Sequence, residues 1–158
     1  MAPIKDPENT LIMETTKGKV VIALRPDLAP KHVERIKKLV REGFYDGIVF
    51  HRVIDGFMAQ TGDPTGTGSG GSKLPNLPAE FSKEHFARGT LGMARTNDPD
   101  SANSQFFIMF ADGAFLDGNY TVFGKVRSGM DCVDQINKGE PPANPDKIVR
   151  LKVQKDIK

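Results

Sequence analysis

The chain has 158 residues but no tryptophan, only one cysteine and no long apolar run. No stretch approaches the roughly 20 apolar residues that a membrane-spanning helix needs, so we expect no such helix. Cys132 has no second cysteine to pair with, which agrees with a reducing compartment and with a small buried side chain rather than a reactive thiol. Residues 1–10 lack the apolar core and cleavage site of a signal peptide. We therefore expect a cytoplasmic protein.

Net charge is also nearly absent, since 22 basic residues stand against 20 acidic ones. The basic residues are scattered, whereas nucleic-acid-binding domains gather them on one segment or face. We expect neither nucleic acid nor a membrane as a partner. The length predicts one domain, residues 1–158, of which about residues 1–9 form a polar N-terminal extension. No oligomer interface is evident in the sequence, and we expect a monomer.

Motifs for nucleotides and metals are missing as well. The run from Gly66 to Gly71 fits the dinucleotide pattern G-x-G-x-x-G, but neither a following helix nor a surrounding β-α-β unit is predicted. Three histidines and one cysteine do not reach the spacing of a zinc site. We therefore expect no cofactor and no metal.

What the chain does contain is a series of short β-rich runs separated by turn residues. Strands are predicted over residues 10–16, 19–25, 45–53, 56–60, 90–94, 105–110, 122–126 and 148–157. Helices are predicted over residues 30–42 and 130–137, and a long loop over residues 61–78. Many short strands with turns between them indicate a closed or nearly closed β-barrel, which removes exposed strand edges.

Two of these runs carry an unusual mixture of residues. The run at 50–60 places Arg52 among apolar side chains, although arginine is charged at any biological pH and is rarely found in such surroundings. Gln60 and Gln105 flank phenylalanines and are poor choices for a purely apolar core. The mixture indicates a functional site.

The motifs around these residues resemble those of the cyclophilins, the cyclosporin-binding class of peptidyl-prolyl cis-trans isomerases, and are nearest to the compact bacterial members. The likeness runs nearly end to end. It is carried by FHR at 50–52, GFMAQTGD at 56–63, LGMA at 91–94, SQFFI at 104–108, LDG at 116–118 and TVFGKV at 121–126. The resemblance implies a mainly β fold, a closed eight-stranded antiparallel β-barrel capped by two α-helices. It also implies isomerase activity on X-Pro bonds that assists protein folding.

The resemblance assigns roles to individual residues. Arg52 matches the catalytic arginine, which donates a hydrogen bond to the prolyl nitrogen, and Gln60 and Phe57 match catalytic positions beside it. The residues expected to bind the substrate, a proline-containing polypeptide, are Met58, Ala94, Arg95, Gln105, Phe107, Phe115, Leu116 and Tyr120. Of these, Met58, Phe107 and Leu116 form the proline pocket together with Phe57.

The chain departs from well-known members of the family at three of these positions. Arg95 replaces an asparagine, which puts a positive charge beside the groove and favours substrates with acidic flanks. Phe115 replaces a tryptophan, and Tyr120 replaces a histidine common in eukaryotic members. Because the indole N–H donor is lost, we expect weak cyclosporin binding with isomerase activity retained.

His51 adjoins Arg52 on a predicted strand and should face the opposite side, as a hydrogen-bonded structural histidine rather than a general base.

Two alternatives to an enzyme remain open. One is a chaperone-like holdase that binds proline segments with incidental turnover, and the other is an inactive barrel scaffold. The presence of Arg52 favours the enzyme, because holding a proline needs an apolar pocket but no charge at its nitrogen.

Overall fold

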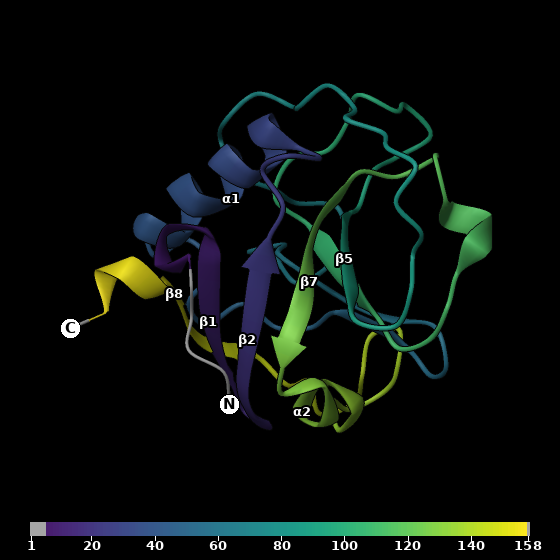
Figure 1. Cartoon of the computed structure of the whole chain (residues 1–158). Helices are drawn as coiled ribbons and strands as arrows, with labels where there is room; N and C mark the ends of the chain where they lie inside the picture. The colour runs from purple at the N-terminus through teal and green to yellow at the C-terminus, as the bar shows by residue number, and fades with distance from the viewer. Residues whose placement is uncertain (1–5, 158) are drawn as a thin grey trace.

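Eight strands form one antiparallel sheet in the computed structural model, which describes residues 6–157. They are β1 (Thr10–Thr15), β2 (Gly18–Leu24), β3 (Arg52–Ile54), β4 (Met58–Thr61), β5 (Thr90–Met93), β6 (Phe106–Met109), β7 (Val122–Ser128) and β8 (Ile148–Val153). Their order across the sheet is β3-β4-β6-β5-β7-β2-β1-β8, and each neighbouring pair is antiparallel. The predicted eight-stranded antiparallel fold is confirmed (Figure 1).

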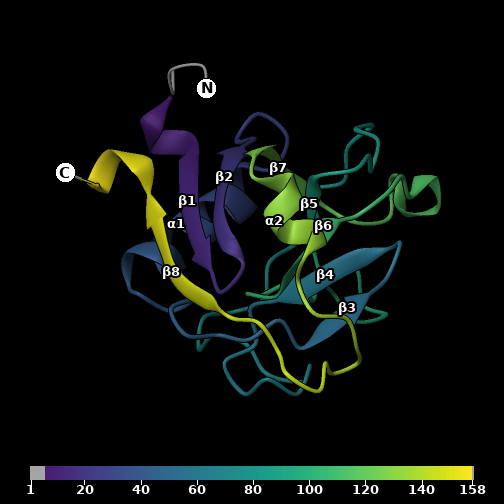
Figure 2. The same cartoon turned by 90° about the horizontal axis from the view of Figure 1, so that it is seen from below.

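The sheet curls so that its two ends come together. Seen from below, the strands follow a ring from β8, β1 and β2 through β7, β5 and β6 to β4 and β3 (Figure 2). A single bridge between Val49 and Lys147 joins the segments that precede β3 and β8. The Phe50 N–H donates to the Asp146 carbonyl at 2.8 Å beside this bridge. Within residues 6–157, this irregular seam closes the ring in place of a β3–β8 ladder.

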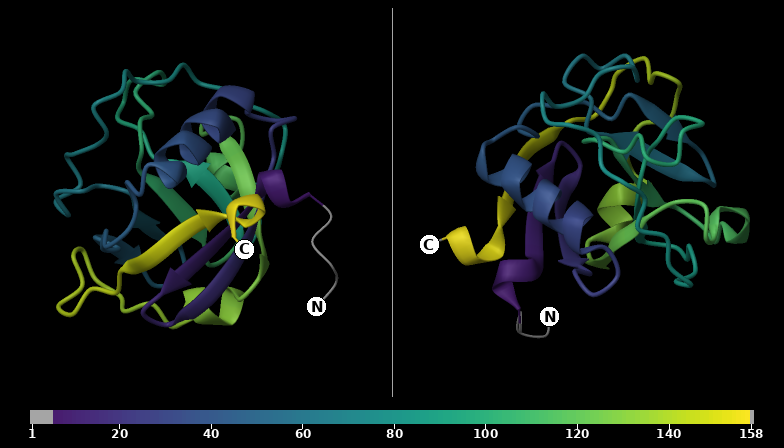
Figure 3. Two further views of the ribbon diagram at one scale, coloured as in Figure 1. Left: turned by 90° about the vertical axis from the view of Figure 1, so that its left-hand side faces the viewer. Right: turned by 90° about the horizontal axis from the view of Figure 1, so that it is seen from above.

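Two helices lie at opposite ends of the strands (Figures 1 and 3). Helix α1 (Pro30–Arg41) begins with proline, which suits a first turn, and ends before Gly43, whose φ of +73° favours glycine. Its predicted apolar residues are buried against the sheet. Helix α2 (Met130–Asp134) is shorter than the predicted 130–137. No helix within residues 6–157 is long and apolar enough to cross a membrane.

The apolar side chains form two clusters. The larger fills the ring and includes Ala59 and Ile108, whereas a smaller one includes Met58 and Phe107. Because successive residues of a strand face opposite sides of the sheet, Met58 and Phe107 lie on its outer face. The sheet therefore buries one face as the core of the barrel and offers the other as an apolar surface.

The prediction of a strand over residues 45–53 is wrong for most of its length, since only residues 52–54 form β3. The segment turns through the core, where Tyr45 is fully buried and its hydroxyl donates to the Ser104 carbonyl at 2.8 Å. Its backbone bonds go to the start of β8, such as Gly47 N–H to the Ile148 carbonyl at 2.6 Å. Burial, rather than a strand ladder, explains its apolar composition.

The predicted N-terminal extension is only partly described, because residues 1–5 lie outside the described range. Pro7–Asn9 form a short 3-10 helix, η1, next to the barrel. The Glu8 carboxylate pairs with Lys37 at 2.7 Å and with Arg41 at 2.8 Å, both on α1. The described part of the extension is therefore attached to the domain.

Candidate active site

Arg52 lies in a row of side chains on the outer face of the sheet. It stands opposite Gln60 of β4, which in turn stands opposite Phe107 of β6. Since neighbouring strands are about 4.8 Å apart, these side chains are close neighbours despite their separation in sequence. The sheet thus brings together a cation, an amide and an aromatic ring.

A cavity of about 410 Å³ adjoins this row. Its lining residues are Arg52, Phe57, Met58, Gln60, Ala94, Arg95, Phe107, Phe115, Leu116, Asn119 and Tyr120. All the predicted site residues except Gln105 are among them. Gln105 lines a second cavity of about 720 Å³, which shares Gln60, Ala94 and Arg95 with the first and so continues it as a groove.

The floor of the first cavity is apolar and closely packed. Met58, Phe107 and Leu116 are at most 6% exposed. Phe107 stacks on Phe86 with ring centroids 5.8 Å apart. Gly92 stands opposite Phe107 on β5, and a Cβ atom there would lie 2.7 Å from the Phe107 ring. The glycine therefore leaves room for the ring, and the result is a rigid apolar recess beside the Arg52 guanidinium.

A chain of hydrogen bonds leads away from Arg52. Its Nη1 donates to Gln60 Oε1 at 3.4 Å, and Gln60 Nε2 donates to Gln105 Oε1 at 2.8 Å. Gln105 Nε2 donates to the carbonyls of Gly68 and Gly70, at 3.0 and 2.8 Å. Gln105 thus binds the glycine-rich loop, and Gln60 is the amide that faces the apolar recess.

The glycine-rich loop is built around a buried carboxylate. Asp63 accepts backbone hydrogen bonds from Thr65, Thr67 and Gly68 at 2.6–3.1 Å. Burial raises the pKa of Asp63, but hydrogen bonds from the Thr65 hydroxyl and from backbone N–H groups that include those of Thr65 and Gly68 outweigh it and hold the pKa below its usual range. Because these N–H groups already bind Asp63, they do not form a phosphate cradle. This agrees with rejecting the dinucleotide interpretation of the loop.

Arg95 lines both cavities. Its guanidinium carbon lies 4.7 Å from the centre of the Tyr120 ring, a cation–π distance. Its Nε donates to the Asn119 carbonyl at 2.9 Å and its Nη1 to the Thr96 carbonyl at 2.8 Å. The positive charge predicted for the groove is therefore present, on a side chain fixed between the two cavities.

Phe115 and His51 differ sharply in exposure. Phe115 is 69% exposed and packs against Phe57 with ring centroids 5.5 Å apart. His51 is buried, on the other side of the strand from the exposed Arg52, as predicted. The hydrogen bond predicted for it is absent, since neither ring nitrogen has a partner among the described residues. Burial lowers the pKa of His51, which keeps the ring neutral near pH 7.

The sequence interpretation missed two residues, one that lines the first cavity and one that contacts Arg52 from outside the groove. Asn119 lies in the sequence between Leu116 and Tyr120, which were both predicted to bind the substrate, so its position in this loop could have indicated its place in the site. Glu140 gives no such signal, because it lies 88 positions after Arg52, yet its Oε1 is 3.0 Å from Arg52 Nε. Nowhere in residues 6–157 do three or more His, Cys, Asp or Glu side chains form a cluster able to hold a metal ion.

Comparison with known proteins agrees with this geometry. The model of the family "cyclophilin type peptidyl-prolyl cis-trans isomerase" matches residues 10–153. A "probable peptidyl-prolyl cis-trans isomerase" of Brucella suis is 58% identical over 99% of this chain and 88% of its own length. "Peptidyl-prolyl cis-trans isomerase-like 1" of Aspergillus fumigatus is 38% identical over 90% of this chain and 94% of its own length.

Solved structures give the same result. The cyclophilin AquaCyp293 from Hirschia baltica superposes with a TM-score of 0.90 at 34% identity, over 97% of this chain and 76% of its own. A cyclophilin-type isomerase of Cryptosporidium parvum, solved in the presence of the dipeptide Ala-Pro, gives a TM-score of 0.85 at 29% identity, over 91% of this chain and 98% of its own. From its sequence, its fold and its groove, the chain belongs to the cyclophilin-type peptidyl-prolyl cis-trans isomerase family.

Proposed function

We propose that the groove binds a proline-containing segment and speeds rotation about its X-Pro bond. The observation that carries the proposal is the apolar recess of Met58, Phe107 and Leu116 with the Arg52 guanidinium at its edge. The recess is apolar, as a site for a proline ring must be, and it lies in a cavity of about 410 Å³ that has room for the ring and its neighbouring peptide groups. The structure of the similar cyclophilin-type isomerase from Cryptosporidium parvum, solved in the presence of the dipeptide Ala-Pro, supports a proline-containing ligand.

The chemistry needs neither a nucleophile nor a metal. Rotation about a peptide bond faces a barrier of about 18–20 kcal/mol, because the nitrogen lone pair is shared with the carbonyl group. A donor that binds this lone pair as the nitrogen becomes pyramidal stabilises the twisted state more than either planar isomer. Arg52 is the donor in this proposal. The recess holds the ring still, and Gln60 binds the adjoining peptide group.

Exchange of a short Ala-Pro peptide, with the chain and with Arg52→Ala, tests the proposal. We expect the wild-type chain to accelerate cis-trans exchange. Loss of the donor should lower kcat/KM by about 10²- to 10³-fold, the range observed when one transition-state donor is removed. The dissociation constant of the peptide should change far less, because the recess is intact.

A peptide that binds without acceleration by the wild-type chain would contradict the enzyme and support the holdase. If Arg52→Ala were as active as wild type, the chain would still be an isomerase, but Arg52 would not be the donor that stabilises the twisted state. Absence of both binding and acceleration would leave only the inactive scaffold.

We further propose that Arg95 favours acidic residues next to the proline. The argument is its fixed position between the two cavities, where no carboxylate within residues 6–157 is paired with it. Exposed ion pairs contribute about 0.2–1 kcal/mol, so a Glu-flanked peptide should be turned over about two- to fivefold better than its Lys-flanked counterpart. Arg95→Gln should abolish that ratio, and 1 M salt should reduce it. Equal turnover of the two peptides by the wild-type chain would refute the preference.

We also propose that the protein resides in the cytoplasm, assists the folding of other proteins and is a monomer. Cytoplasmic residence is supported by the single cysteine, and fractionation of the source cells would test it. A role in assisting folding would show as faster refolding of a protein limited by proline isomerisation. A sedimentation measurement would test the expected monomer.

A further inference from the structure

Arg52 is held by a residue outside the groove. Its Nε donates to Glu140 Oε1 at 3.0 Å, whereas its Nη1 reaches Gln60 Oε1 at 3.4 Å. No hydrogen bond involves Nη2 within the described part of the chain. The carboxylate thus occupies one edge of the guanidinium and leaves the Nη edge for the groove.

The loop that carries Glu140 is fixed to the same strand as Arg52. Gly139, just before it, exchanges two backbone hydrogen bonds of 2.8 Å with Val53, the residue just after Arg52. Gly139 has a φ of +144°, and a Cβ atom there would lie 2.5 Å from the Pro142 Cα. A glycine is therefore required for this approach, which sets the Glu140 side chain beside Arg52.

The far end of the loop is fixed as well. The Asn137 N–H donates to the buried Asp146 carboxylate at 2.7 Å, and the Asn137 side chain donates to the Asn144 carbonyl at 2.7 Å. The loop is therefore closed on itself on either side of Glu140. Glu140, the partner of Arg52, therefore lies on a loop that is held in place.

Stability alone does not explain this ion pair. Arg52 is 46% and Glu140 55% exposed, and pairs exposed to this degree contribute little to folding. An arginine side chain this exposed can adopt many conformations, of which few aim the Nη atoms at the recess. We propose that Glu140 is a positioning residue, which holds the Arg52 guanidinium in the orientation that donates to the prolyl nitrogen.

The inference rests on the proposed isomerase activity, and Glu140→Gln tests it. Glutamine has nearly the same shape but no charge, so the bond to Nε weakens. We expect kcat/KM for the Ala-Pro peptide to fall by about three- to tenfold, because a misplaced catalytic group loses part of its effect. The peptide dissociation constant should change by less than about twofold, because the recess is untouched. Glu140→Asp, which keeps the carboxylate, should be more active than Glu140→Gln.

Glu14→Gln is the matched control. Glu14 pairs with Arg150 Nε at 3.1 Å, is about as exposed as Glu140, and lies on β1 away from the groove. This change should leave kcat/KM as in wild type.

A second test uses the Arg52→Ala background. If Glu140 acts through Arg52, adding Glu140→Gln there should have no further effect on the residual rate. The Arg52 Nε–H resonance should also shift in Glu140→Gln and stay unchanged in Glu14→Gln.

Three results would overturn the proposal: wild-type activity in Glu140→Gln, higher activity in that variant, or an equal loss with and without Arg52. An inactive wild-type chain would instead refute the proposed function itself.

Discussion

At the scale of single residues, what the groove can bind depends on the chemistry of the side chains on its rim. Phe115 is the clearest case. It lies on the rim of the recess, packs only against Phe57 among the aromatic rings described here, and has no polar atom. Its ring can contact a ligand but cannot donate a hydrogen bond to one.

Because Phe115 offers no hydrogen-bond donor at the rim of the recess, it affects how tightly cyclosporin binds. We expect the wild-type chain to bind the drug weakly. Phe115→Trp should tighten the dissociation constant by about threefold to tenfold, since one hydrogen bond contributes about 0.5–1.5 kcal/mol. Isothermal titration of both proteins would measure this.

Turnover of the Ala-Pro peptide should be nearly the same in both proteins, which separates drug binding from catalysis. A nanomolar dissociation constant for the wild-type chain would refute the prediction.

The residues of the groove were largely accessible from sequence, and the partner of Arg52 was not. The groove residues belong to contiguous motifs such as residues 56–63 and 104–108, so their identity survives in the sequence itself. Glu140 is brought to Arg52 only by the Gly139–Val53 bridge, which is a tertiary contact. No local pattern can reveal such a pairing.

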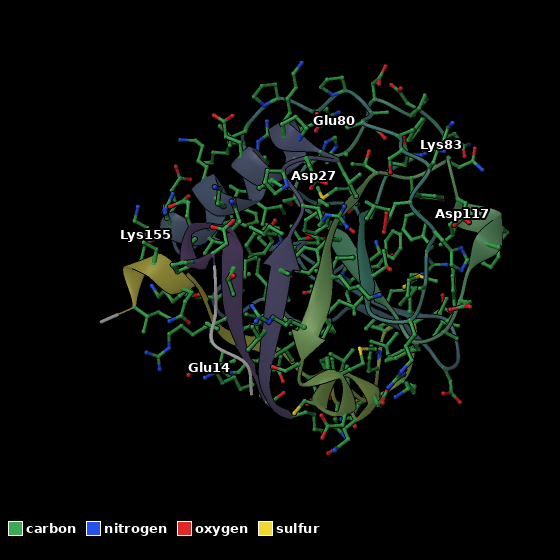
Figure 4. All side chains as sticks on the ribbon, viewed as in Figure 1. Glu14, Asp27, Glu80, Lys83, Asp117 and Lys155 are labelled. Atoms are coloured by element: carbon green, nitrogen blue, oxygen red, sulfur yellow. The ribbon has the colours of Figure 1, made fainter. Side chains whose placement is uncertain are left out.

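At the scale of elements, α1 has an unusual start. The residue before it is Ala29, whose methyl side chain cannot accept hydrogen bonds from the N–H groups of the first turn. Glu80, from the long segment between β4 and β5, performs this role. It accepts from the backbone N–H groups of Lys31 and His32, at 3.3 and 2.8 Å, and lies beside the N-terminal end of α1 in Figure 4. A carboxylate here also complements the helix dipole.

We therefore expect Glu80→Ala to lower the free energy of unfolding by about 1–2 kcal/mol, the range for loss of a helix cap. Urea unfolding would measure it. The control is Glu34→Ala, at an exposed position of the same helix, which should change stability by less than about 0.5 kcal/mol. Equal effects of the two changes would show that Glu80 does not act as a cap.

Sequence patterns predicted elements best where the pattern and the burial agreed. The α1 stripe and the hairpin of β1 and β2 were found to within one or two residues. The strand prediction failed for residues 45–51 because an apolar run fits a buried strand and a buried turn equally well. There the backbone bonds to β8, a segment about 100 residues later, which local propensity cannot anticipate.

At the scale of the whole molecule, the two ends of the described chain meet on α1. Arg41 pairs with Glu8 near the start and with Asp156 near the end, at 2.8 and 2.9 Å. Hydrogen bonds from Arg41 and Lys37 lower the pKa of Glu8 from 4.5 to about 2. This pair of contacts fastens η1 and the C-terminal turn to one helix.

Stability should therefore depend on pH through Glu8. Its pKa is lower in the folded protein, so its contribution is present above about pH 4.5 and is lost as the pH falls through about 2. At pH 7 we expect Glu8→Gln to lower the free energy of unfolding by at most about 1 kcal/mol, since the pair is about one-third exposed and screened by water.

Urea unfolding of both proteins at pH 7 and pH 3 would show whether the difference shrinks in acid. Glu34→Gln, without an ion pair in the described structure, should show no such trend. A difference that is constant with pH would contradict the prediction.

The groove lies on the outer face of the sheet, and its two cavities adjoin one another instead of leading into the filled ring. A polypeptide can therefore lie across it without threading a chain end inside. A proline in the middle of a long loop, on a protein already partly folded, is as accessible to such a surface as one in a tetrapeptide. Which proteins can be substrates then depends on how freely each one exposes a short extended stretch around a proline. It does not depend on the size of the protein.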